Sequence, residues 1–186
     1  MMSWFQENYG AAFANPILQS VLIVWGAVIA AKITDIIFTR IFKRIVDKTQ
    51  TSLDDQILQL LHRPIFYTIL FIGFSVAVKT AGLPEYLDFA LVGIFKTITI
   101  LIWLVIVMKG LVVSMEWASK KTTNPLLQKK TLPLFNNLGK IGIGLFGIYF
   151  IFLSWDININ GILASAGVLG VVLGLAAKDT VANFFA

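Results

Sequence analysis

The chain has 186 residues, of which 58% are hydrophobic and only 13% are charged, and its formal net charge is +5. A soluble domain usually holds about 45–50% apolar and about 25% charged residues, so this composition excludes an ordinary soluble core and indicates an integral membrane protein. There is no cysteine, which excludes disulfides, zinc ribbons and a thiol nucleophile.

Five apolar segments follow one another along the chain. Each has roughly the 20 residues that a helix needs to cross about 30 Å of hydrocarbon. A helix is predicted for each, because an isolated strand cannot satisfy its backbone polar groups in lipid. The sequence therefore predicts an all-α membrane protein with five transmembrane helices. Their approximate bounds are 17–38, 65–83, 87–115, 132–153 and 157–177.

Basic residues are shared unequally between the connections. The stretches 39–63 and 116–131 hold nine lysines or arginines, whereas the connections on the other side hold only Lys79. Loops on the cytoplasmic side of a membrane are enriched in such residues. We therefore expect residues 1–16 outside the cell, both basic connections inside, and the C-terminal end in the cytoplasm.

The first basic connection contains the stretch TSLDDQILQLLHRP, which has apolar residues at helical spacing. Ser52 is a candidate N-cap, and the stretch predicts an amphipathic helix at about 52–63. Pro64 is expected to open the second span, because proline suits the first turn of a helix. This helix is either an interfacial element that senses lipid headgroups or an ordinary connector.

Few charges lie within the predicted spans. The aliphatic stems of the lysines among them can run along the helices while the ammonium groups reach the lipid headgroups. His62, the only histidine, is expected in a loop with a structural role. No Ser/His/Asp set, paired membrane carboxylates, HExxH motif or phosphate-binding loop is present, so we expect no enzyme, no metal site and no cofactor. Charged residues of the spans include Lys32 with Asp35, Lys96, Lys109 and Lys140.

The last segment ends GVLGVVLGLAAKDTVANFFA, and its glycines and apolar residues fall on different faces of a helix. At about 100° per residue, Gly167, Gly170 and Gly174 share one face. Glycine lets helix backbones approach closely. A ring of such helices would enclose a hydrophobic pore gated by dewetting, whereas the alternative is a central helix packed within one subunit. The other face carries Ala164, Val168, Val171 and Leu175.

The string Gly174-Leu-Ala-Ala-Lys-Asp-Thr180, followed by Ala182-Asn-Phe-Phe185, resembles the pore helix of the small-conductance mechanosensitive channel (MscS) family. The number and orientation of the upstream spans resemble members with five spans. The resemblance implies a homo-heptameric ion channel whose last membrane helix lines the pore. It also implies opening by bilayer tension, which releases ions and small solutes on osmotic downshock. Membrane lipids, further copies of the chain and permeating ions are the implied partners, with no nucleic acid, and the implied location is the bacterial inner membrane.

The resemblance also assigns roles to particular residues of the last segment. The bend is expected to need support from side chains, because Asp179 stands where some members have glycine. The resemblance implies a gate formed by Val171 and Leu175 and a pore lined by Ala164 and Val168. It assigns helix packing to Gly167, Gly170 and Gly174, and a bend at the inner mouth to Lys178 and Asp179. An interfacial half contains Asn183, Phe184 and Phe185.

The implied organisation has an external segment at 1–16, four peripheral helices over 17–153, and the pore helix with the start of its interfacial half over 157–186. Family members continue into a cytoplasmic vestibule, which these 186 residues do not contain, so we expect the whole protein to be longer. The alternative function is a secondary transporter or permease subunit. That alternative would require broken helices and buried polar groups around a substrate, and the sequence has no internal repeat and no buried acid.

Overall fold

The computed structural model describes residues 15–46, 52–121 and 131–185, with side chains described except at 42–46, 52–59, 121, 180–181 and 184–185. The predicted external segment lies outside the described residues except for its last two positions. The described residues form five helices: α2 (Pro16–Val46), α3 (Ser52–Thr80), α4 (Glu85–Lys121), α5 (Leu132–Ser154) and α6 (Asn160–Phe185).

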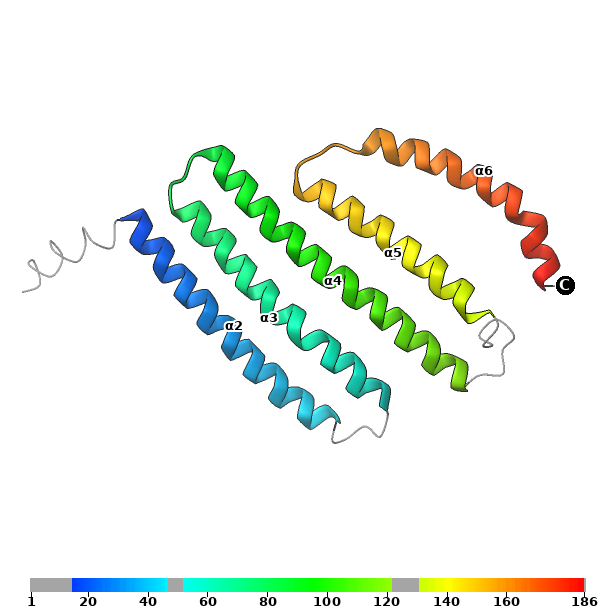
Figure 1. Ribbon diagram of the computed structural model, residues 1–186, viewed down its shortest axis with the longest axis horizontal. Coiled ribbons are helices and arrows are strands. Elements are labelled where there is room, and N and C mark those ends of the chain that lie inside the picture. Colours follow the sequence, from blue (N-terminus) through cyan, green and yellow to red (C-terminus); the bar gives the residue numbers. More distant parts are fainter. Residues whose placement is uncertain (1–14, 47–51, 122–130, 186) are drawn as a thin grey trace, which may run out of the picture.

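Helices α2 to α5 form a row of antiparallel neighbours. α2 packs on α3, α3 on α4 and α4 on α5, so each helix contacts those next to it in sequence. Figure 1 shows the four helices side by side, with successive helices running in opposite directions. α6 is set apart from this row and follows it through a short connector. The first four helices are therefore a packed unit, and the fifth stands beside it.

All five predicted membrane helices are found within the described ranges, and each is long and apolar enough to span a membrane. The predicted all-α class is confirmed. The ends of the helices differ from the prediction. α3 ends at Thr80 rather than Leu83, because Gly82 takes a left-handed conformation with φ of 67°. Glycine adopts this conformation without a Cβ clash, and it ends helices readily.

Pro64 does not open the second span as predicted, because it lies inside α3. The amphipathic stretch 52–63 and the second span are one continuous helix, so the predicted break between them is wrong. A membrane helix tolerates an internal proline where neighbouring groups compensate for the missing N–H. Here the Pro64 side chain is fully buried. The carbonyl that loses its helical partner is that of Leu60, one turn earlier, whereas the Thr68 hydroxyl donates to the Pro64 carbonyl at 2.7 Å.

Small residues form the contact between α2 and α3. Ala31 is completely buried and Ala27 is 8% exposed. On the facing helix, a Cβ added at Gly73 would overlap the Cβ of Ala27. Close approach of this kind is how helices associate in lipid, where burial of apolar surface gives no advantage over contact with acyl chains.

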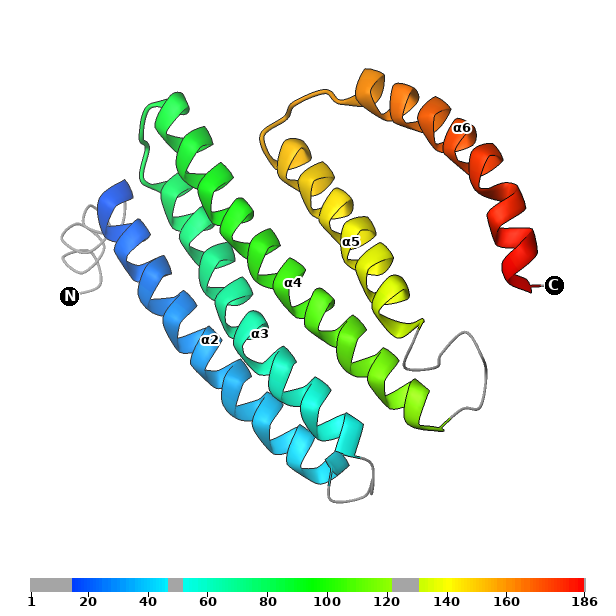
Figure 2. The same ribbon diagram turned by 45° about the vertical axis from the view of Figure 1, so that its right-hand side comes forward.

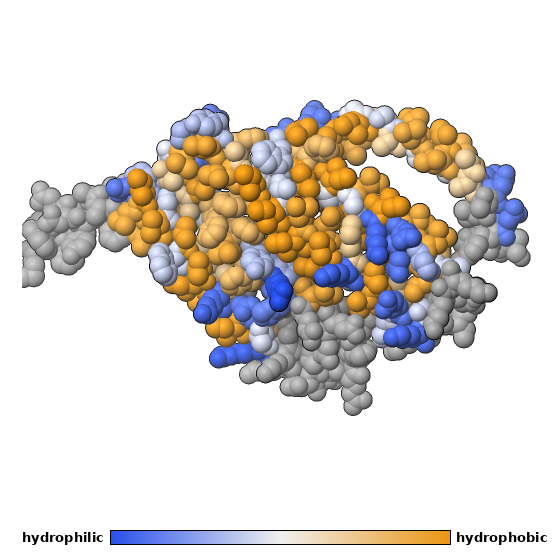
Figure 3. All heavy atoms as spheres, viewed as in Figure 1, coloured by the Kyte–Doolittle hydropathy of each residue, from blue (hydrophilic) through white to orange (hydrophobic). Residues whose placement is uncertain are grey.

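Most large apolar side chains of the described residues face outward. Only a few apolar residues are buried, among them Ala77, Val92 and Ile159. Figure 3 shows apolar side chains over most of the visible face of the helices, with polar side chains gathered toward the helix ends. Such a surface suits hydrocarbon rather than water, and it agrees with the membrane assignment made from composition.

We predict that Gly73→Ala destabilises the helix row, because its new methyl group has no room beside Ala27. Overpacking of this kind costs about 1–3 kcal/mol, which should lower the thermal unfolding midpoint of the purified protein by several degrees. Gly26→Ala is the matched control, since a Cβ at Gly26 meets nothing within 4 Å. Equal midpoints for the two variants would show that the α2–α3 contact is not close-packed.

Candidate functional site: the last helix and its anchor

α6 is one continuous helix, so the two faces expected from the sequence exist on it. Val171 and Leu175 are one turn apart on the same face, about 6 Å along the axis at about 1.5 Å per residue. Ala164 and Val168 continue this gate face toward the start of the helix. Figure 2 shows α6 curving along its length beside α5.

The glycine face of α6 is open within its own chain. A Cβ added at Gly167, Gly170 or Gly174 would meet nothing within 4 Å. The large side chains of the helix are equally exposed, with Val171 at 65% and Leu175 at 69%. The alternative that α6 is a central helix packed within one subunit is therefore wrong for this structure. Neither face of α6 is packed against another described part of the chain.

Lys178 and Asp179 are exposed, and neither has an ion-pair partner among the described residues. The helix passes through both without interruption. It curves over its whole length in Figure 2 rather than breaking at this pair. A bend localised at Lys178 and Asp179 stays a prediction.

The predicted interfacial half is helical as far as Phe185. Asn183 is exposed, while the side chains of Phe184 and Phe185 lie outside the described residues. The start of α6 differs from the prediction: the helix begins at Asn160 rather than Ile157. The Asn158 side chain accepts the Asn160 N–H at 3.0 Å in an Asx turn just before the helix, and the Ile159 carbonyl accepts the first helical N–H, from Leu163.

The connector that precedes α6 is fixed to α4 by Trp155. Its indole N–H donates to Thr97 Oγ1 at 2.9 Å. Its ring meets Phe89 edge-on, with 5.8 Å between ring centroids, and lies over Gly93, where a Cβ would come within 3.2 Å of it. Asp156 then takes a left-handed conformation with φ of 52°. Trp155 thus fixes the connector to the helix row, whereas no residue of the span Asn160–Asp179 is buried.

A second contact that the sequence did not reveal joins α3 to α2. His62 lies within α3, not in a loop as predicted, and its Nε2 is 2.8 Å from Asp35 Oδ1 and 3.0 Å from Thr39 Oγ1. The Thr39 hydroxyl donates to the Asp35 carbonyl at 2.8 Å, so its oxygen accepts from His62. Nε2–H is therefore shared between two acceptors on α2. Asp35 follows Lys32 by three positions in the sequence, and its contact in the structure is on the next helix.

Comparison with known proteins places both α5 and α6 in one family. Residues 137–178 match the family model described as "Mechanosensitive ion channel, transmembrane helices 2/3". The small-conductance mechanosensitive channel MscMJ of Methanocaldococcus jannaschii is 30% identical over 97% of this chain and 52% of its own length. An uncharacterized MscS family protein of Aquifex aeolicus is 27% identical over 79% of this chain and 40% of its own length. No solved structure matches the chain.

The chain belongs to the MscS family. The family prediction made from the end of the sequence is confirmed, and the similarity to the M. jannaschii channel extends it to all five helices. This MscS-family chain spans about half the length of the curated relatives it matches, at 52% and 40%. The transporter alternative is not favoured, because the named relative is a channel.

We predict that copies of this chain assemble through the open glycine face of α6, and that Gly170→Leu disturbs this assembly because it fills that face. Native mass spectrometry of the purified protein should show a smaller share of the full oligomer. Gly26→Leu, on the outer helix α2 where space is also open, is the control. Normal assembly of Gly170→Leu would remove this face from the contact between subunits.

Proposed function

We propose that this chain is the membrane part of a subunit of an ion channel that membrane tension opens, and that α6 lines its pore. The observation that carries the proposal is an apolar helix with no packed face among the described residues, in a family whose named relative is a mechanosensitive channel. The subunit acts as a channel and not as an enzyme. Seven copies form the ring, a number taken from the family resemblance.

In this ring the glycine side of each α6 packs against the far side of the next α6. At about 100° per residue the gate face lies beside the glycine face, and so turns toward the ring axis. Val171 and Leu175 then form two apolar rings about 6 Å apart. A pore with such walls loses its water at the narrowest ring and stops conducting.

Tension opens the pore because the open ring occupies more area in the membrane than the closed ring. A stimulus shifts an equilibrium only if it favours one state energetically. Helices α2 to α5 offer the lipid-facing surface on which tension acts, and Trp155 carries movement of α4 to the start of α6 through its bond to Thr97. Membrane lipids are therefore the physical partner of gating.

The excess of basic residues in the connections after α2 and after α4 supports a cytoplasmic position for both. The channel lies in the plasma membrane, with the end of α6 at the cytoplasmic mouth of the pore. Opening on osmotic downshock would release ions and small solutes. Patch-clamp recording from liposomes tests the activity: current steps on suction support a channel, and saturable uptake without steps would support a transporter.

We predict that Leu175→Ser gives a leaky channel that slows cell growth, because a hydroxyl in the gate ring lets water remain there. Leu173→Ser is the matched control. Leu173 is 68% exposed against 69% for Leu175 in the single chain, but it points to the opposite face of α6. Equal leak from the two variants, or an unchanged threshold without leak in Leu175→Ser, would remove Leu175 from the gate.

We predict that Lys178 and Asp179 act as a pair between adjacent subunits. On the helix, Lys178 falls at the glycine edge of the gate face and Asp179 at its other edge, so a ring brings Lys178 of one subunit to Asp179 of the next. Lys178→Ala and Asp179→Ala should each shift the opening tension, and the double variant should shift it by less than the sum. Additive shifts would show that the two residues do not pair.

A further inference from the structure

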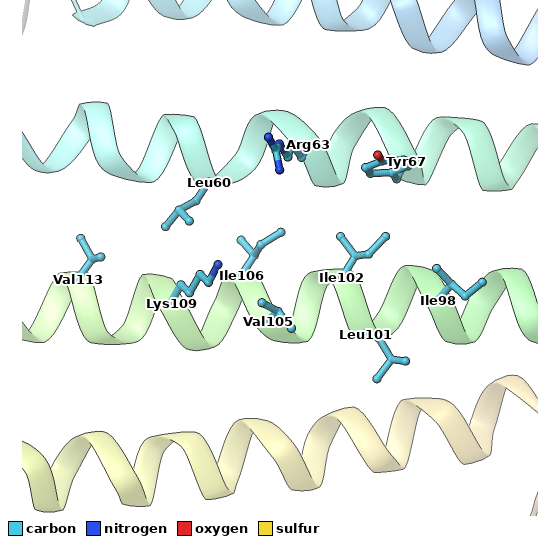
Figure 4. A pocket seen from close by; sticks show the side chains of 10 residues that line it. All are labelled: Leu60, Arg63, Tyr67, Ile98, Leu101, Ile102, Val105, Ile106, Lys109 and Val113. Atoms are coloured by element: carbon cyan, nitrogen blue, oxygen red, sulfur yellow. The ribbon is translucent and has the colours of Figure 1, made fainter.

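A groove between α3 and α4 combines an apolar wall with two cations. Its volume is about 890 Å³. Figure 4 shows Arg63 on α3 and Lys109 reaching across from α4 toward that helix. Tyr67 borders the groove one turn beyond Arg63 on α3. The apolar wall comes from α4 and includes Ile98, Leu101, Ile102 and Val105.

The two cations of the groove lack a counter-charge within the part of the chain that the structure describes. Among the described side chains no carboxylate lines the groove, and neither Arg63 nor Lys109 forms an ion pair with any of them. Asp35, the carboxylate that contacts the adjacent His62, is engaged by that histidine. Two positive charges on facing helices repel each other, so an anion between them would lower the energy of this arrangement.

The depth of the cations matches a layer of lipid headgroups. Arg63 lies about 25 Å along α3 from Thr80, and Lys109 lies about 36 Å along α4 from Glu85, at about 1.5 Å per residue. Since the hydrocarbon core is about 30 Å thick, both cations are close to the membrane surface opposite the α3–α4 turn. Ile98 is about 16 Å from Lys109 toward the centre of the bilayer, which is about half of that thickness.

We propose that this groove binds one anionic phospholipid of the leaflet on the side of the basic connections. Arg63 and Lys109 hold its phosphate, and an acyl chain lies along the apolar wall toward Ile98. The Tyr67 hydroxyl lies between these regions, where it faces the ester groups of the lipid. A zwitterionic lipid supplies the same chain without the net negative charge that basic residues attract. The site depends on the chain being in a membrane and not on its activity as a channel.

The test measures lipid retention by the purified protein with native mass spectrometry, using phosphatidylglycerol and phosphatidylcholine as probes. The wild-type protein should retain phosphatidylglycerol in preference. Arg63→Gln combined with Lys109→Gln should weaken retention about thirtyfold, since each basic residue near the membrane surface contributes to anionic-lipid binding. The matched control combines Lys96→Gln with Lys140→Gln, which removes two exposed lysines outside the groove.

A charge-preserving exchange, Arg63→Lys with Lys109→Arg, separates loss of charge from loss of structure and should keep the lipid. Equal retention of the two lipids by the wild type, or equal loss from the groove variant and its control, would overturn the site. Loss from the charge-preserving exchange would overturn it as well. Displacement of the bound lipid by millimolar inorganic phosphate alone would show an anion site without a lipid site. Because the readout is lipid retention, a silent patch-clamp recording would contradict the proposed function and leave this site standing.

Discussion

Inside a bilayer, packing two apolar helices together removes no surface from water, because lipid chains are as apolar as the side chains. Which helices associate therefore depends on how closely their surfaces fit. α6 is under this constraint along its whole membrane span, where no residue is buried in the single chain. Its glycines leave a smooth strip that lipid fills poorly and another helix fills well. In the proposed ring, this glycine strip packs against the next α6. The apolar gate face beside it is then directed at the ring axis.

Helices α2 to α5 achieve this close fit within one chain, in contrast to α6. Ala27 of the neighbouring helix fills the space in front of Gly73, and Leu104 fills the space in front of Gly147. These glycines therefore have packing partners on the neighbouring helix. Hydrogen bonds add fixed points between the helices. The Trp103 indole N–H donates to Thr68 Oγ1 at 2.9 Å, and Trp155 makes the corresponding bond to Thr97. Helices α2 to α5 pack together, and a connector anchored by Trp155 joins them to α6. This arrangement suits a channel in which forces from the lipid on α2 to α5 move α6.

Hydropathy was sufficient to predict the five helices, because a membrane leaves the backbone no other choice. It could not predict that Pro64 lies inside α3, because burial of its ring depends on neighbouring helices that a sequence does not place. His62 and Asp35 are 27 positions apart, so their contact follows from the pairing of α2 with α3 and not from any local pattern. Trp155 bonds to Thr97 from 58 positions away, and nothing in the sequence selected that acceptor.

The glycine and gate faces of α6 were predictable because they follow from helical spacing alone, and the family was predictable because its motif is contiguous. Which surface each face of α6 contacts depends on how several copies of the chain assemble. Electron cryo-microscopy of the full-length protein in lipid nanodiscs tests this most directly. We expect a ring in which α6 surrounds a central axis, with Val171 and Leu175 directed at that axis and the glycines against the next subunit. A particle in which α6 lies on the lipid-facing perimeter, or folds back onto its own helix row, would contradict it.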